Sequence, residues 1–174
     1  MEETSLSRNS LMLIAMANEY CHVLENAQEN EYIEFVDKML KLLPRIYMSV
    51  TDVEEKEDEE SMVYIESYLQ ETEYNSVREA LYQVLGDKDD YLEVFEEDMK
   101  YSDAPILTTI SENLSDLYQE MYNLVMSVKN SPAEVANDII LSSKTNFSEY
   151  WGQTLVNVLR ALHNVKYNNE IIDE

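Results

Sequence analysis

Glycine and proline are scarce in this sequence, which has two glycines and three prolines among 174 residues. A β-rich fold needs many tight turns and uses more of both residues, so the scarcity favours long helices joined by short loops. Hydrophobic residues make up 45% of the chain, which is enough for one sizeable core. We therefore predict an all-α fold, a single-domain antiparallel helical bundle of about five to seven helices over residues 1–174.

Basic residues are also few, because 12 lysines and arginines stand against 36 aspartates and glutamates, for a formal net charge of -24. This charge repels nucleic acid and anionic membranes. No apolar run is long enough to cross a bilayer, and the short one at residues 11–17 follows an acidic leader, unlike a secretory signal. Cys21 is the only cysteine, so an internal disulfide cannot form. We predict a cytoplasmic protein with no nucleic-acid partner and no membrane partner.

Histidine and cysteine, the usual residues of metal sites and nucleophilic pairs, number two and one. Glu19 and His22 form a Glu-x-x-His on a predicted helix, a spacing that helical di-iron bundles use twice. The second copy is missing, because Arg160 stands where a glutamate would precede His163. On a helix, Cys21 points about 100° away from His22, and the two glycines are too far apart for a phosphate-binding loop. The sequence assigns no catalytic residue, no metal ligand and no cofactor.

Apolar residues near the end of the chain recur at steps of 4, 4, 3, 4 and 3, the period of an amphipathic helix. They are Phe147, Trp151, Leu155, Val158, Leu162 and Val165. We predict that they form a central bundle helix with Trp151 in the core. A second stripe runs from Ile110 to Val128 and predicts the direct neighbour of that helix. Thr109 to Glu112 have the form of a capping box that opens it.

The same spacing predicts three more helices, at residues 5–26, 31–47 and 74–84. Asn30 is the predicted N-cap of the second. Pro44 lies inside its pattern and is expected to kink the helix or to end it near Leu43. Gly86 is expected to stop the third helix.

Three further segments carry weaker helix signals. A short helix is predicted at residues 62–69, and the aspartates of residues 87–90 predict the N-cap and first turn of another. Ser131 to Glu134 form a second capping box with proline at the first helical position. It opens either one long helix over residues 132–166 or two helices with a break at residues 142–146.

Negative charge is concentrated in the middle of the chain. Residues 54–100 hold 17 acids and 4 bases, so 13 of the 24 excess negative charges lie there. Six of the 17 acids fall within the seven residues 54–60, which we interpret as a solvated acidic loop because no glycine or spaced aspartate pattern shapes a calcium site. Residues 101–108 are predicted to be a connecting loop and residues 167–174 a frayed tail.

Several short motifs occur in an order that resembles the bacterial domain of unknown function 5063 family. They are Glu19-Tyr20-Cys21 with Glu25, Leu42-Leu43-Pro44 with Tyr47, Asp90-Tyr91-Leu92, the run from Leu114 to Gln119, and Phe147 to His163 with Trp151-Gly152 and Leu162-His163. The resemblance covers most of the chain. It implies a small helical bacterial protein in the cytoplasm, and it implies no reaction and no site residues.

Tyrosine, with 13 residues against three phenylalanines, gives the best clue to function. Exposed tyrosines beside acids suit a protein-binding surface that attracts a basic protein. The predicted partner-binding residues are Tyr64, Tyr68, Tyr91, Asp116 and Gln119. The prediction is a non-enzymatic protein–protein interaction module whose oligomeric state the residues leave open. The alternative is a small-molecule- or metal-dependent enzyme with a site between helices, near Glu19, His22, Asp116 and His163.

Overall fold

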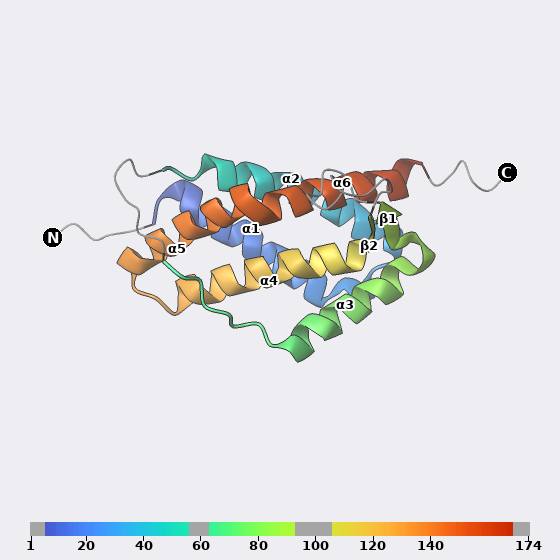
Figure 1. The fold of residues 1–174 in the computed structure, drawn as a ribbon, viewed down its shortest axis with the longest axis horizontal. Helices are drawn as coiled ribbons and strands as arrows, with labels where there is room; N and C mark the ends of the chain where they lie inside the picture. The colour runs from blue at the N-terminus through green and yellow to red at the C-terminus, as the bar shows by residue number, and fades with distance from the viewer. Residues whose placement is uncertain (1–5, 56–62, 93–105, 169–174) are drawn as a thin grey trace.

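The computed structural model describes residues 6–55, 63–92 and 106–168. Six α-helices dominate these residues, together with one antiparallel sheet of two short strands (Figure 1). The helices are α1 (Arg8–Glu25), α2 (Tyr32–Asp52), α3 (Glu71–Leu85), α4 (Ile110–Lys129), α5 (Ala133–Asn146) and α6 (Gly152–Tyr167), and the strands are β1 (Asp90–Leu92) and β2 (Leu107–Thr109). The predicted all-α bundle is confirmed. No helix among the described residues combines the length and apolar content that a membrane crossing needs.

Helix α4 lies at the centre of the arrangement, since it packs against α1, α3, α5 and α6. Helix α2 packs against α1 and α6 and closes a ring of helices around the core, whereas α3 covers α4 from outside this ring. Helices α1 and α2 run antiparallel, because the Asn9 side chain at the start of α1 donates a hydrogen bond of 2.9 Å to the carbonyl oxygen of Asp52 at the end of α2. Figure 1 shows α5 and α6 as one rod that runs along α4.

The core is built from the apolar stripes of these helices. Trp151 is only 3% exposed, so the prediction that it lies in the core is confirmed. Its ring packs edge-on against Phe147, with ring centroids 4.7 Å apart. Tyr20 is fully buried as well, and its hydroxyl donates a hydrogen bond of 2.7 Å to the carbonyl oxygen of Leu114. This bond connects α1 to the second turn of α4 and satisfies the buried phenol.

A π-helical turn at Phe147–Trp151 joins α5 to α6. The region predicted as one helix or two is therefore a single helical run with a widened turn inside it. No break occurs at residues 142–146, which belong to α5. The turn explains why a glycine follows the tryptophan, because a Cβ atom on Gly152 would lie 2.6 Å from the carbonyl oxygen of Phe147.

Two predicted helix ends are confirmed. The Thr109 hydroxyl accepts a hydrogen bond of 3.1 Å from the backbone N–H of Glu112 and so caps α4. Gly86 follows the last residue of α3 with a φ of 57°, a left-handed conformation that glycine adopts most easily. Both ends are set by residues within one turn of the helix, which is why the local sequence could predict them.

Two other predicted caps are wrong. Helix α2 begins after Glu31 rather than Asn30, and α5 begins after Pro132 rather than Ser131, in neither case with a side-chain cap. The Asn30 side chain instead accepts a hydrogen bond of 3.0 Å from the Lys38 amine. A competing contact about two turns into α2 has therefore replaced the cap predicted for Asn30.

Pro44 neither ends α2 nor shortens it, because the helix continues to Asp52. The missing backbone donor costs one hydrogen bond. Leu42, Leu43 and Ile46 are all buried on either side of the proline, so tertiary packing holds the helix together across it.

Three local predictions failed where distant segments meet. Residues 63–70 form no helix, and Asn123 of α4 accepts hydrogen bonds from the backbone N–H groups of Tyr68 and Leu69 instead. The helix expected after residue 87 is replaced by a short 3-10 turn and β1. Strand β1 pairs with β2, so Leu107 and Thr108 are strand residues rather than loop. Most of the acidic loop (residues 56–60), residues 101–105 of the connecting loop and residues 169–174 of the tail lie outside the described residues.

Candidate functional site

Three of the five predicted partner-binding residues gather on one surface between α3 and α4. Asp116, Gln119 and Asn123 follow one another on α4 at steps of three and four residues and so share a helix face. Tyr74 of α3 donates a hydrogen bond of 2.5 Å to the Asp116 carboxylate, and Asn123 holds the backbone of Tyr68 at 2.8 Å. We call these five residues the α3–α4 face.

The Asp116 carboxylate has an unusual electrostatic setting. Although the residue as a whole is exposed, its carboxyl group lies against Tyr74, and the pKa of Asp116 is raised, mainly by partial burial. The charge of Glu112 adds to the increase, whereas the Tyr74 hydrogen bond and the Arg78 cation oppose it. The pKa of the Tyr74 phenol is raised in turn, by burial first and by Asp116 second. In this pair the Tyr74 hydroxyl is the donor and the Asp116 carboxyl oxygen is the acceptor.

Further acids on three helices interact in two pairs, Glu25 with Glu73 and Asp116 with Glu120. Burial raises the pKa of Glu25 on α1, and the charge of Glu73 on α3 adds to the increase. Burial also raises the pKa of Glu120 on α4, with a further increase from Asp116. We call Glu25, Glu73, Asp116 and Glu120 the acidic strip. None of the four forms an ion pair with another described residue.

Two tyrosines of α4 lie near the acids Glu25 and Glu73. The rings of Tyr118 and Tyr122 lie with centroids 5.7 Å apart. The pKa values of both phenols are raised, first by burial and then by nearby carboxylates that include Glu25 and Glu73. The surface thus combines aromatic area with closely spaced negative charge, which is the chemistry that attracts lysine and arginine side chains.

The thiol of Cys21 borders the strip and is not activated. Burial raises its pKa to about 12, and the neighbouring Glu25 adds to the increase. A thiol with such a pKa is protonated at neutral pH, and the thiolate is the nucleophile. Cys21 therefore serves as a small buried apolar side chain.

The two remaining predicted residues lie elsewhere. Tyr64 is 82% exposed in the extended segment that precedes Tyr68, so the helical pairing of these two tyrosines is wrong. Tyr91 is half-buried in β1, and its hydroxyl accepts a hydrogen bond from the Asn113 side chain. Tyr91 thus contacts the first turn of α4, some distance along that helix from Asn123.

The residues of the alternative enzyme site have three different surroundings. Glu19 and His22 line a pocket of about 520 Å³ between α1 and α2. Asp116 pairs with Tyr74, and His163 stacks on Tyr167 with ring centroids 4.7 Å apart. Within the described ranges, no three histidine, cysteine, aspartate or glutamate side chains are grouped to hold a metal ion.

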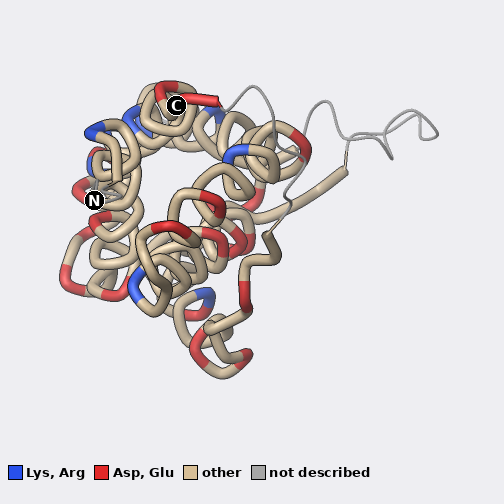
Figure 2. The backbone as a smooth tube through the Cα atoms, turned by 90° about the vertical axis from the view of Figure 1, so that its left-hand side faces the viewer, with Lys and Arg blue, Asp and Glu red and all other residues tan. Residues whose placement is uncertain are grey.

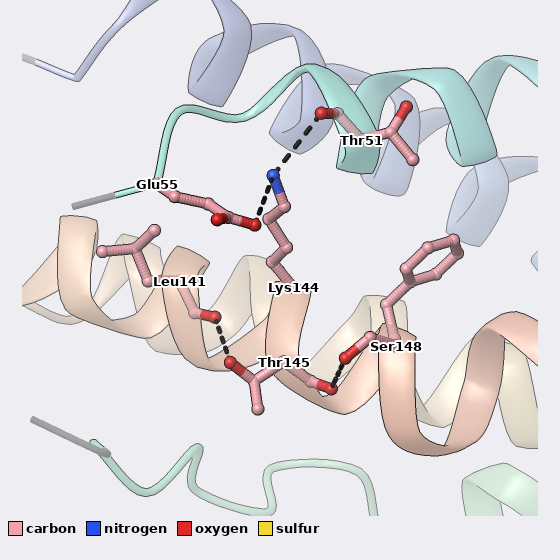
Figure 3. Close-up of a pocket in the computed structure, with 7 residues that line it drawn as sticks. Thr51, Glu55, Leu141, Lys144, Thr145 and Ser148 are labelled. Carbon is pink, nitrogen blue, oxygen red and sulfur yellow. Dashed lines mark hydrogen bonds and ion pairs between the residues drawn. The ribbon is translucent and has the colours of Figure 1, made fainter. Parts of the chain in front are cut away.

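A second pocket, of about 610 Å³, lies where α5 meets the end of α2 (Figure 3). The Lys144 amine there donates to the carbonyl oxygens of Val53 at 2.5 Å and Thr51 at 3.4 Å, and lies 3.5 Å from the Glu55 carboxylate. The hydroxyls of Thr145 and Ser148 donate to carbonyl oxygens within their own helical run. Lys144 is therefore engaged in closing the C-terminus of α2, and the two hydroxyls are engaged within their own helical run, so this pocket is structural.

The sequence prediction missed Tyr74 and three of the four acids of the strip. Glu112, Asp116 and Glu120 recur every four residues, a signal of one acidic helix face that the sequence does contain. Glu25, Glu73 and Tyr74 come from other helices, and no local spacing connects them with α4. Glu57, Asp58, Glu59 and Glu60 of the predicted acidic loop lie outside the described residues.

Comparison with known proteins identifies relatives and no activity. The profile of a domain of unknown function, DUF5063, matches residues 4–168. A crystal structure of a protein from Bacteroides fragilis is similar to this chain, with a TM-score of 0.75 and 33% sequence identity over 92% of this chain and 94% of that one. No curated protein matches. Because the profile spans nearly all of the chain and the solved relative shares its fold, this protein belongs to the DUF5063 family.

Proposed function

We propose that this protein is a single-domain, cytoplasmic, non-enzymatic interaction module that binds a basic protein surface through the α3–α4 face and the acidic strip. The observation that carries the proposal is the set of four unpaired carboxylates of the strip, three of which have raised pKa values. Acids held close together repel one another, and the nearby Arg78 and His22 offset this repulsion only in part. This repulsion destabilises the free protein. A partner's lysine or arginine side chains would remove it, so the repulsion favours binding.

The tyrosines of the surface supply the apolar part of the contact. Tyr68 and Tyr122 are both partly exposed beside the acids. Tyrosine contributes a large contact area and loses little conformational freedom, so it is frequent at the centre of interfaces. Arg78 already lies 5.8 Å from the ring centre of Tyr74, which shows that a guanidinium group fits against this aromatic surface.

The test uses the partner recovered from native cells with a tagged chromosomal copy. The triple variant Glu25→Gln, Asp116→Asn and Glu120→Gln should lower the association rate about tenfold at low salt, since electrostatic steering scales with charge near the contact. The difference from the unmodified protein should shrink as salt is added. The rate is measured by surface plasmon resonance.

The matched control variant is Glu66→Gln, Glu134→Gln and Glu149→Gln, which changes the charge equally at exposed positions away from the strip. It should retain most of the association rate. Equal losses of association rate in both variants would show that net charge alone causes the effect. An unchanged association rate in the variant of the acidic strip would contradict the proposal.

The alternative function, a small-molecule- or metal-dependent enzyme, has one observation in its favour, the shared pocket of Glu19 and His22. Metal analysis of protein purified without chelators or a histidine tag tests it. Stoichiometric iron, manganese or zinc that is lost on His22→Ala would favour the enzyme over the interaction module.

A further inference from the structure

The pocket between α1 and α2 has the opposite charge pattern from the acidic strip. Lys38, Lys41 and Arg45 line it from α2, at steps of three and four residues on one helix face. Asn26 and Asn30 line it from the end of α1 and the turn that follows. We call these five residues the basic pocket. It concentrates three of the 12 basic residues of a chain whose net charge is -24.

The cations of the basic pocket are not neutralised by ion pairs. Lys144 and Lys166, by contrast, each lie within 4 Å of a carboxylate. Within the described part of the chain, Lys38, Lys41 and Arg45 make no such contact. Like charges four residues apart on a helix repel one another. In a chain with three acids for every base, this arrangement leaves positive charge available to a ligand.

The amide side chains at the other wall provide further polar groups. Asn30 accepts a hydrogen bond of 3.0 Å from Lys38, which fixes this amine at the wall of the pocket. Asn26 lies beside His22, with 3.4 Å between its amide nitrogen and the ring Nδ1. Buried Val23 and Leu42 also line the pocket. Ammonium, guanidinium and amide donors over an apolar base form a typical anion-binding set.

We propose that the basic pocket binds a small organic dianion, a molecule that carries a phosphate group or a pair of carboxylates. A volume of about 520 Å³ is within the usual range for small-molecule sites. Arg45 presents a planar pair of donors that matches either group, and the lysines add point charges. Large polyanions are excluded, because the net charge of -24 repels nucleic acid and anionic membranes at a distance.

Two acids restrict where the anionic group lies. Glu19 and Glu29 line the same pocket from α1 and the turn after it. Their carboxylates repel any negative group near that wall and can accept hydrogen bonds from hydroxyls. The dianion therefore lies on the α2 side, against Lys41 and Arg45, and neutral hydroxyl-bearing parts of the ligand face Glu19.

Isothermal titration calorimetry with inorganic phosphate, and in a second arm with succinate, tests the proposal at constant ionic strength. We expect saturable one-to-one binding to the unmodified protein. The double variant Lys41→Gln and Arg45→Gln should bind at least about tenfold more weakly, because both charge and bidentate hydrogen bonding are lost. Tighter binding of phosphate or of succinate identifies which dianion the pocket takes.

The control is the double variant Arg8→Gln and Lys129→Gln, which removes the same charge from exposed positions outside the pocket. Its affinity should match that of the unmodified protein. The absence of binding in both arms, or equal weakening in the two double variants, overturns the proposal. If the pocket variant does not fold, Arg45→Lys takes its place, since it keeps the charge and loses the planar fork. A severalfold loss of affinity then supports the proposal, and an unchanged affinity overturns it.

Discussion

Single residues in this protein make hydrogen bonds with groups that lie far away in the sequence. Asp89 is only 1% exposed, and its carboxylate accepts two hydrogen bonds of 2.6 Å, from the backbone N–H and the hydroxyl of Ser111. The sequence predicts that aspartates here cap a helix. Asp89 does cap one, but it is α4, which begins 21 residues later. The residue type thus predicted the role, whereas only the fold decided which helix receives it.

Trp151→Ala should lower the free energy of unfolding by about 3–5 kcal/mol, because the substitution leaves a large cavity beside Phe147 in the core. Urea denaturation followed by circular dichroism measures the change. The indole Nε1 atom is buried and has no hydrogen-bond partner among the described residues. Trp151→Phe, the matched control, removes that unsatisfied donor and keeps an aromatic ring, so it should cost less. Equal stability of Trp151→Ala and the unmodified protein would show that the ring does not pack as described.

Elements are stabilised here by their neighbours as much as by their own residues. Helix α2 runs through Pro44 because its buried residues pack on α1 and α6. The C-terminus of α2 is closed by Lys144, which lies 91 residues away from Val53 in sequence. The π-helical turn between α5 and α6 likewise keeps Phe147 and Trp151 both facing the core. A prediction from local spacing alone takes none of these tertiary contacts into account.

Gly152→Ala tests the π-helical turn. Alanine normally stabilises a helix by about 1 kcal/mol relative to glycine. At this position the new Cβ would lie 2.6 Å from the Phe147 carbonyl oxygen, so we expect a loss of about 1–3 kcal/mol from overpacking instead. The midpoint of thermal unfolding gives the sign directly. Greater stability of the variant would mean that the run relaxes to a regular α-helix at no cost.

The whole molecule carries a large and unevenly distributed charge. Figure 2 shows more acidic than basic segments along the described backbone. The net charge of -24 exceeds the magnitude of about 2–8 that solubility of a small domain requires. Two places depart from an even distribution, the acidic strip around α4 and the basic pocket between α1 and α2. Both proposals for function rest on these departures.

The pH dependence of stability follows from the raised carboxyl pKa values of Glu25, Asp89, Asp116 and Glu120. Such groups bind protons more readily in the folded chain than in the unfolded one, where carboxyl pKa values are about 4. Stability therefore falls as pH rises through their raised values, and the thermal midpoint should be higher at pH about 5 than at pH about 7. The Glu54 carboxylate accepts hydrogen bonds from its own backbone N–H and from Ser7, which lower its pKa. Glu54 therefore acts in the opposite sense, but the four groups with raised pKa values outnumber it.

The control for this prediction is the double variant Asp116→Asn and Glu120→Gln, which should flatten the pH profile between these values. Added salt should raise the midpoint of the unmodified protein at pH about 7, since it screens the same repulsion. A thermal midpoint that decreases steadily from neutral to mildly acidic pH would contradict the assignment of these four groups.

The sequence by itself determined the helices that carry a long apolar stripe, the end of α3, the start of α4, the burial of Trp151, and the family to which the chain belongs. These features depend on the spacing or order of residues along the chain, so they can be predicted from the sequence. The tertiary structure alone decided that residues 63–70 are extended and that Asp89 caps α4. It also decided that Tyr74 of α3 meets Asp116 of α4 and that Glu25 of α1 lies near Glu73 of α3, because these side chains come together only when the helices pack. Local periodicity fixes the face that each helix buries, and contacts between faces determine the site.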